Sequence, residues 1–481
     1  MEPQDKKKIL IRSSLASVGA IALFVVLFFT LGPAVFGQST PGNSSSERKY
    51  AQMFEQVFSF VSRNFVDEPD QQKLFEGAMK GLFDSLGDPH SLYLSDTDMM
   101  GLNDTTTGEF GGVGLYINKT DPSQASKSSD VREHYVEIVA PIEDTPAYKA
   151  GILAGDYITK IQGEDVTEFS MDKVLSVLRG KPGTKVKVTI LRGSATSLDF
   201  ELERAKIEVP TVKTAWIEPA IAYLRITQFN AHTKEKFDEA IAGFDKKSYG
   251  KLIIDLRNNP GGLLEIVAKI GGRFFKDGVI VSTRSRVPGE SSTYNAENEQ
   301  TVADSVQIIV LIDKGSASAS EILSGALKDR KRALLVGETS YGKGSVQQII
   351  PFDKTGFKLT MARYYTPSGV NIDKVGIKPD LEVKDPDLSD AELEIYRKLL
   401  NDKKLETWAK AHPDGTAASI AIFVKQLQSE GVTLNERLLT RLVRVEQWRA
   451  KNQNPPTIDL DYDLVLKKAV ELLDAGPLAL P

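Results

Sequence analysis

Strand and helix patterns alternate along the sequence from residue 220 to about residue 383. The apolar strand patterns lie at 221–226, 252–256, 308–312 and 334–336, and the helix patterns lie at 233–244, after Gly262 and from Ser320. Strands that alternate with helices are typical of βαβ units, in which the helices pack on the faces of one sheet. The chain is therefore expected to be built around an α/β core.

The chain has 481 residues, which exceeds what one hydrophobic core usually organises. Short β-rich runs broken by Gly and Pro predict a compact β-rich module over 106–206, inserted between N-terminal helices at 49–105 and a core at 207–385. Helix patterns separated by Gly and Pro predict a helical C-terminal region over 386–481. The expected fold class is α/β multidomain.

The first 37 residues combine basic residues with an uncharged, mostly apolar run at 13–36. About 20 apolar residues span a bilayer, and basic residues stay on the cytoplasmic side. This pattern predicts a single-pass membrane protein in which everything after Gln38 lies outside the cytoplasm, in the periplasm or the extracellular space. The alternative is a signal peptide cleaved before Gln38, which would give a secreted protein. Residues 38–48, rich in Ser, Gly, Asn and Pro, predict a flexible tether.

Composition excludes several classes of function. The formal net charge of -5 argues against a nucleic-acid partner, because such binding relies on basic residues that neutralise phosphates. There is no cysteine, which excludes disulfides, thiolate metal sites and a cysteine nucleophile. The histidines have no metal-ligand spacing, so no metal and no cofactor is expected. These histidines are His90, His134, His232 and His412.

A nucleophile is suggested where the strand at 308–312 passes through small residues into a helix. Free N–H groups at a helix N-terminus stabilise developing negative charge, and small neighbours let a carbonyl group approach a hydroxyl. Ser316, Ser318 and Ser320 all lie at this junction. A serine at such a position also caps helices, so the pattern alone leaves both interpretations open.

A serine hydroxyl needs a base, and since histidine is scarce the candidate is a lysine held neutral by burial. Lys343, between Gly342 and Gly344, fits this requirement, although a solvent-exposed loop lysine is the simpler alternative. Residues 337–344 also approximate a phosphate-binding P-loop, which would indicate a nucleotide hydrolase. Gly344 stands where magnesium binding needs Ser or Thr, and 346–351 predicts a strand where a P-loop needs a helix.

Several motifs together resemble the C-terminal processing peptidases, also called tail-specific proteases. They are residues 88–91 (Asp-Pro-His-Ser), 255–262 (Asp-Leu-Arg-Asn-Asn-Pro-Gly-Gly), 315–322, 337–347, 365–369 (Tyr-Thr-Pro-Ser-Gly) and 376–380 (Gly-Ile-Lys-Pro-Asp). The resemblance implies that Ser318 is the nucleophile, that Lys343 is the base and that Gln347 orients the lysine. It also implies an oxyanion hole formed by the backbone N–H groups of Gly261 and Ala319.

The module at 106–206 resembles a PDZ domain. Its residues Gly111, Gly112, Val113, Gly114 and Leu115 are similar to a carboxylate-binding loop. Successive amides in a glycine-rich turn form an anion-binding concavity, and a following strand can pair with an extended peptide.

The combined expectation is a serine endopeptidase that recognises the free C-termini of protein or peptide substrates through its PDZ domain. A membrane contact through the N-terminal segment and a homo-oligomer are the other expected partners. The alternative from a different class is a proteolytically silent PDZ scaffold or chaperone, and the P-loop nucleotide hydrolase is a third hypothesis.

Overall fold

The computed structural model describes residues 44–119, 131–142, 145–153, 155–193, 196–217, 219–384, 388–451, 453 and 455–480. The chain forms two compact units. Of the described residues, those at 44–100 and Gln347–Met361 form one unit, and those at 101–346 and from Ala362 onward form the other.

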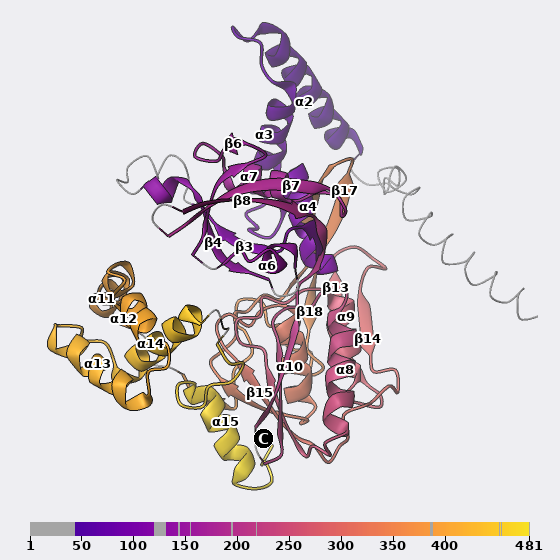
Figure 1. Cartoon of the computed structure of the whole chain (residues 1–481). Helices are drawn as coiled ribbons and strands as arrows, with labels where there is room; N and C mark the ends of the chain where they lie inside the picture. Colours follow the sequence, from indigo (N-terminus) through magenta and orange to yellow (C-terminus); the bar gives the residue numbers. More distant parts are fainter. Residues whose placement is uncertain are drawn as a thin grey trace, which may run out of the picture. The chain divides into compact units, whose positions relative to one another are not determined.

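The first unit contains two helices and an antiparallel sheet (Figure 1). Helix α2 spans Ser44–Asn64, and α3 spans Gln71–Asp84 behind an N-cap formed by the Asp70 carboxylate. The strands are β1 (Leu92–Leu94), β17 (Ser345–Phe352) and β18 (Thr355–Tyr365), and β18 pairs with both of the others.

The sequence at 88–91 connects α3 to β1. The Asp88 carboxylate accepts a hydrogen bond from the Ser91 hydroxyl (2.6 Å), and this hydroxyl accepts one from the Thr360 N–H of β18 (3.0 Å). Burial alone would raise the pKa of Asp88, but hydrogen bonds from Ser91 and Thr360 hold it below its usual value. The motif therefore joins the helical part of this unit to its sheet.

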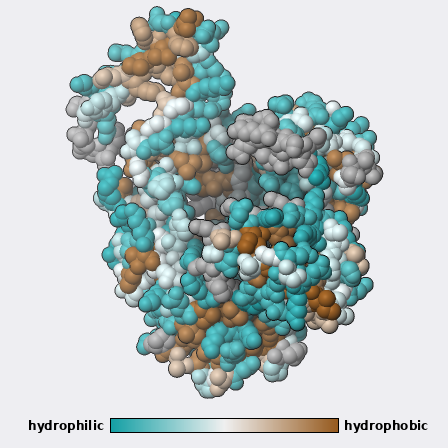
Figure 2. Space-filling view, turned by 90° about the vertical axis from the view of Figure 1, so that its left-hand side faces the viewer, coloured by the Kyte–Doolittle hydropathy of each residue, from teal (hydrophilic) through white to brown (hydrophobic). Residues whose placement is uncertain are grey.

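Helix α2 keeps apolar side chains on its surface. Tyr50, Val57 and Phe60 are 67%, 61% and 68% exposed. Figure 2 shows one face of the molecule, on which apolar patches are set in a mostly hydrophilic surface. The amphipathic pattern that predicts this helix does not correspond to a buried stripe in this chain.

Helix α4 (Asp96–Thr107) contains the boundary between the units at Gly101, and a β-rich module follows it in the second unit. Strands β3, β4, β5, β7 and β8 form one antiparallel sheet in that order, so that β3 is an edge strand. The elements of the module are β2 (Glu109–Gly112), β3 (Leu115–Asn118), β4 (Val136–Pro141), α6 (Pro146–Lys149), β5 (Tyr157–Ile161), β6 (Glu164–Asp165), α7 (Met171–Leu178), β7 (Lys185–Arg192), β8 (Thr196–Glu203) and β9 (Ala205–Glu208). They enclose a separate core that includes Val136, Ile158 and Val174.

The central sheet of the second unit confirms the predicted α/β core. Its strand order is β10-β11-β12-β15-β16-β19, with β10 antiparallel and the rest parallel. These strands are β10 (Val212–Ile217), β11 (Ile221–Ile226), β12 (Lys251–Asp255), β15 (Gln307–Ile312), β16 (Leu334–Gly337) and β19 (Leu381–Glu382). The hairpin of β13 (Val279–Ser285) and β14 (Ser292–Asn295) was not predicted from the sequence.

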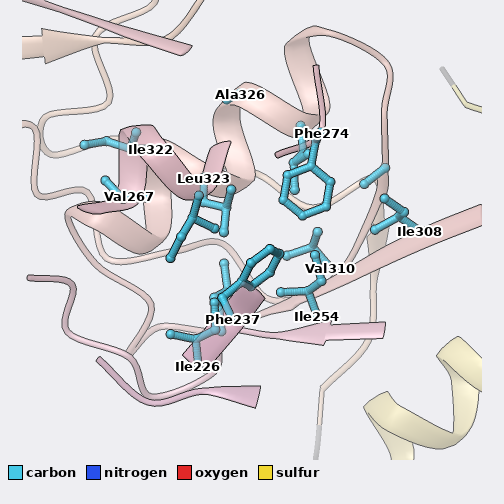
Figure 3. Packing of buried hydrophobic residues seen from close by; sticks show 14 of the residues in the cluster. Ile226, Phe237, Ile254, Val267, Phe274, Ile308, Val310, Ile322, Leu323 and Ala326 are labelled. Atoms are coloured by element: carbon cyan, nitrogen blue, oxygen red, sulfur yellow. The ribbon is translucent and has the colours of Figure 1, made fainter. Parts of the chain in front are cut away.

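One face of the central sheet is covered by α8 (Thr233–Asp245), α9 (Leu264–Gly272) and α10 (Ala319–Asp329). Figure 3 shows this core, in which Phe237 and Phe274 pack among strand residues such as Ile254 and Val310. Because the strands are buried on both faces, they appear in the sequence as continuous apolar runs.

The opposite face of the sheet is covered by α15 (Leu464–Asp474). Val465, Leu466 and Leu473 pack on strand residues that include Ile253 and Ile309. The other C-terminal helices are α11 (Asp390–Asn401), α12 (Lys404–Ala411), α13 (Ala417–Ser429) and α14 (Glu436–Ala450), and they share an apolar cluster of their own. The helical region at 386–481 thus contains two parts. Helices α11 to α14 form one apolar cluster, and α15 covers the second face of the central sheet.

The predicted single-pass membrane placement, with the catalytic part outside the cytoplasm, is contradicted by the structure. Among the helices of the described residues, none combines the length and the apolar character needed to cross a bilayer. The run at 13–36, to which the span was assigned, lies outside the described residues.

Replacing Leu466 by alanine is expected to destabilise the second unit by about 2–5 kcal/mol, because this side chain is 1% exposed and its loss leaves a cavity against the sheet. Leu82→Ala on α3, where the side chain is 58% exposed, should change stability by about 0.5 kcal/mol or less. Urea denaturation followed by circular dichroism measures both. Equal effects of the two variants would contradict the packing of α15 on the sheet.

Candidate active site

The three candidate serines differ in their surroundings. Ser316 and Ser320 are fully buried, and their hydroxyls donate to the carbonyl oxygens of Leu256 (2.9 Å) and Asn259 (3.0 Å). Ser318 is only partly buried. Ser316 and Ser320 therefore hold the turn before α10 against the loop after β12 by hydrogen bonds. Ser318 is the most accessible of the three serines.

Ser318 has an unusual backbone conformation. It precedes α10 with φ 55° and ψ −112°. Positive φ is costly for a residue with a Cβ atom, and such strain persists only where the surrounding structure imposes it. The turn between β15 and α10 thus holds this serine in a fixed and unfavourable conformation.

The buried carboxylate of Glu321 connects the serine turn to the lysine loop. Its Oε2 accepts hydrogen bonds from the backbone N–H groups of Ser318 (2.8 Å) and Lys343 (2.9 Å). Its Oε1 accepts hydrogen bonds from the Ser340 hydroxyl (2.6 Å) and from the Gly342 N–H (2.7 Å). One side chain therefore fixes the spacing between the two candidate catalytic residues.

Glu321 was not singled out from the sequence, although a signal for it exists. Ser318 and Glu321 have the S-x-x-E spacing of a capping box, in which the glutamate reaches back to the N-cap N–H. The local pattern identifies that one hydrogen bond. The contact with the loop around Lys343 depends on the tertiary fold.

Lys343 lies in the loop between β16 and β17 and is partly buried. A Cβ atom on Gly344 would approach the Asp373 backbone nitrogen to 2.5 Å, so this position requires glycine. The Gly344 N–H donates to Asp373 Oδ1 (3.2 Å), and its carbonyl accepts from the Tyr364 N–H (3.0 Å). The chain then enters a strand, which rules out the P-loop hypothesis because a P-loop is followed by a helix.

Tyr364 is a further buried polar residue beside the candidate serine. Its side chain is 2% exposed, and within the described residues its hydroxyl has no hydrogen-bond partner of normal geometry. Burial raises the pKa of Tyr364 well above its usual value, the Glu321 carboxylate adds to this effect, and the Ser318 hydroxyl opposes it. The phenol therefore stays protonated at neutral pH in the neighbourhood of both residues.

Gly261 and Ala319 are the predicted oxyanion donors, and both lie against Ser318. Gly261 has φ +102°, and a Cβ atom on it would come within 2.7 Å of the Ser318 Cβ and 2.9 Å of the Ala319 nitrogen. Ala319 is the first residue of α10, so its N–H has no acceptor inside the helix. The Gly261 N–H, in contrast, donates to Asn259 Oδ1 (2.9 Å). An oxyanion at this site would compete with Asn259 for that N–H.

A charged cluster supports the loop that carries Gly261. Fully buried Asp255 accepts hydrogen bonds from the Tyr223 hydroxyl (2.7 Å) and from Arg257 Nη2 (2.6 Å). Burial alone would raise the pKa of Asp255, but Arg257, with Arg225 and Tyr223, holds it below its usual value. Asp255 is therefore an anionic anchor at the end of β12.

Gln347 lies near the start of β17 and belongs to the first unit. Its side-chain Nε2 donates to the Thr360 hydroxyl at 3.4 Å. Its role beside the lysine stays a prediction.

The predicted carboxylate-binding loop connects β2 to β3. Gly111 and Gly112 belong to β2, Leu115 begins β3, and Val113 and Gly114 form the turn between the strands. In the described part of the chain, the N–H groups of Val113 and Gly114 have no recorded acceptor, whereas both carbonyls accept hydrogen bonds. Gly114 has φ +80°, and a Cβ atom there would collide with the Thr145 side chain. The loop is thus packed tightly against Thr145 at Gly114.

Comparisons with known proteins agree with this arrangement. The model of peptidase family S41 matches residues 220–383, a PDZ domain model matches 137–192, and the model of the activating protease CtpB N-terminal domain matches 19–98.

Similar proteins cover most of the chain. The carboxy-terminal-processing protease of Bartonella bacilliformis is 38% identical over 425 residues, which is 85% of this chain and 94% of that protein. The carboxy-terminal processing protease CtpA of Bacillus subtilis is 30% identical over 457 residues, which is 94% of this chain and 92% of that protein. A solved structure of the photosystem II D1 C-terminal processing protease matches with 29% identity and a TM-score of 0.41, covering 71% of this chain and 95% of that chain.

Because a relative at 38% identity is matched over nearly its whole length, and because the central sheet coincides with the peptidase match, the chain belongs to the carboxy-terminal processing proteases of peptidase family S41 and is a serine-type peptidase.

Proposed function

We propose that this chain is an endopeptidase that captures protein C-termini and cleaves them with Ser318 as nucleophile and Lys343 as general base. The observation that carries the proposal is the Glu321 carboxylate, which binds the backbone N–H groups of both residues. A catalytic pair needs a fixed separation, and a shared buried anchor provides it.

The chemistry begins with a neutral Lys343 amine. As Ser318 Oγ attacks the scissile carbonyl carbon, its proton moves to Lys343 Nζ, and the tetrahedral oxyanion forms beside the Ala319 N–H and the Gly261 backbone. The Lys343 ammonium then returns the proton to the leaving amine, and an acyl-enzyme remains on Ser318. Water attacks the ester with Lys343 again as base, which releases the acid product and restores both residues.

Substrate capture is assigned to the PDZ domain. The N–H groups of Val113 and Gly114, which have no acceptor within the described residues, suit a terminal carboxylate, and β3 lies at one edge of its sheet. An extended peptide can therefore add to β3 by main-chain hydrogen bonds while its carboxylate binds the loop.

Ser318→Ala and Lys343→Ala are each expected to lower kcat by about 10³-fold or more on an unfolded protein substrate, and the double variant should be no worse than either, because the two residues act as one unit. Ser320→Ala is the matched control, since the Asn259 carbonyl still accepts the Ala317 N–H (3.0 Å). This control should keep kcat within a few-fold. Full activity of the Ser318 or Lys343 variant would refute the proposal, and binding without cleavage in the wild type would indicate a scaffold.

Glu321→Gln is expected to lower kcat by about 10²-fold with the fold retained. In the wild type each oxygen of Glu321 accepts two hydrogen bonds. An amide NH₂ group cannot accept, so either orientation of Gln leaves two of the four donors without their acceptor, and the serine and lysine loops separate as a result. Steady-state kinetics and near-UV circular dichroism together check this. Wild-type kcat in this variant would show that the carboxylate does not set the geometry of the pair.

Tail capture is tested by peptide binding to the Ser318→Ala protein, which keeps the PDZ domain and lacks the nucleophile. A peptide with a free C-terminal carboxylate should bind at least about tenfold more tightly than the same peptide with an amidated C-terminus, because the amide removes the charge that the loop binds. Fluorescence anisotropy gives both affinities. Equal affinities would exclude this loop as a carboxylate site.

A further inference from the structure

The loop that carries Gly261 is held by a residue from the far end of the chain. The Arg257 guanidinium makes a two-pronged contact with Asp463, from Nη1 to Oδ1 (2.8 Å) and from Nη2 to Oδ2 (2.6 Å). Asp463 follows Arg257 by 206 residues in the sequence. It is also the N-cap of α15, where its Oδ1 accepts the Leu466 N–H (2.9 Å).

Most of the other anchors of this loop come from within the central sheet and its turns. The Arg257 N–H donates to Asp255 Oδ1 (3.0 Å), and the Asn258 N–H donates to Asp313 Oδ1 (2.8 Å). The Asn259 side chain donates to the Ile226 carbonyl (2.8 Å) and accepts the Gly261 N–H. The contact with Asp463 joins the C-terminal region to this loop.

Arg257 needs both of its carboxylates. A guanidinium offers five N–H donors in a rigid fork, and its side chain here is only 15% exposed. Asp255 accepts hydrogen bonds from Nε and Nη2, which leaves the outer edge of the fork for Asp463. A cavity of about 540 Å³ beside Arg257 is also lined by Asp313 and Glu338. Without Asp463, the guanidinium would lose two hydrogen bonds on the side that faces this cavity, and the loop would be free to shift with it.

We propose that Asp463 is a positioning residue for the reaction, acting through Arg257 to keep the backbone of Gly261 against Ser318. This inference rests on the proposed function, because it assumes that the oxyanion forms beside Gly261. The C-terminal helix α15 thereby becomes part of the catalytic apparatus as well as a cover for the sheet.

The test compares two isosteric changes at opposite ends of α15. Asp463→Asn retains an N-cap oxygen for the Leu466 N–H but removes the charge and one acceptor that Arg257 uses. Asp474→Asn is the matched control, because it removes the ion pair with Lys251 (2.8 Å) at the other end of the same helix and of β12. Both changes weaken the docking of α15 on the sheet. Only Asp463→Asn removes a contact with the loop that carries Gly261.

Asp463→Asn is expected to lower kcat by about ten- to a hundredfold with KM within about twofold of the wild-type value, because displacing the loop impairs oxyanion stabilisation more than substrate binding. The affinity for a peptide boronate, whose tetrahedral adduct occupies the oxyanion site, should fall in parallel. Asp463→Glu, which keeps the charge, should recover part of the loss. Asp474→Asn should leave kcat and boronate affinity within about threefold.

Unchanged kcat in Asp463→Asn would overturn the inference, and so would an equal loss in Asp474→Asn, since the effect would then be one of helix docking alone. Thermal unfolding of both variants shows whether each is folded at the assay temperature. If Asp463→Asn is unfolded there, the same comparison is made at a lower temperature at which both variants are folded, and the same outcomes support or contradict the inference. The Ser318→Ala protein distinguishes a failure of the proposed function from a failure of this inference. Activity in that protein would refute the proposed function, whatever the result for Asp463→Asn.

Discussion

The site depends on one buried carboxylate with four hydrogen-bond donors. Glu321 is fully buried, and an uncompensated charge in that position would cost several kcal/mol. Its compensation comes from donors on two segments: one on the turn before α10, and three on the loop after β16. The charge can be buried only when both segments are in place. Folding of the core and the positioning of the two segments that carry Ser318 and Lys343 thus depend on the same hydrogen bonds.

The central sheet explains why both loops can meet at Glu321. In a parallel sheet the carboxyl ends of neighbouring strands lie at one edge, and β12, β15 and β16 are adjacent and parallel. The loop with Gly261, the turn with Ser318 and the loop with Lys343 follow these three strands in order. With helices on one face and α15 on the other, the sheet is a rigid base for all three segments.

The sequence predicts those features that depend on local pattern. The apolar runs at 221–226 and 308–312 agree with β11 and β15 because strands buried on both faces leave a continuous signal. Ser318 and Lys343 are recognisable because their neighbouring small residues form motifs. The three bonds from the loop after β16 to Glu321 and the contact of Asp463 with Arg257 join distant segments, so no local pattern encodes them. The burial of the Tyr364 hydroxyl likewise depends on the tertiary fold. A helical region at 386–481 was predicted, but the packing of α15 on the sheet was not, since an apolar stripe does not specify what it covers.

The hydrogen bonds of Glu321 also bear on how a lysine can act as a base beside a carboxylate. An ionised carboxylate has about four lone-pair sites, and here each oxygen already accepts two hydrogen bonds. The carboxylate therefore holds the main chain of Lys343. A direct ion pair would favour the protonated amine, which cannot take a proton from Ser318. In the proposed mechanism, donors that saturate the Glu321 carboxylate would let it position the main chain of Lys343 without a direct ion pair to the proposed base.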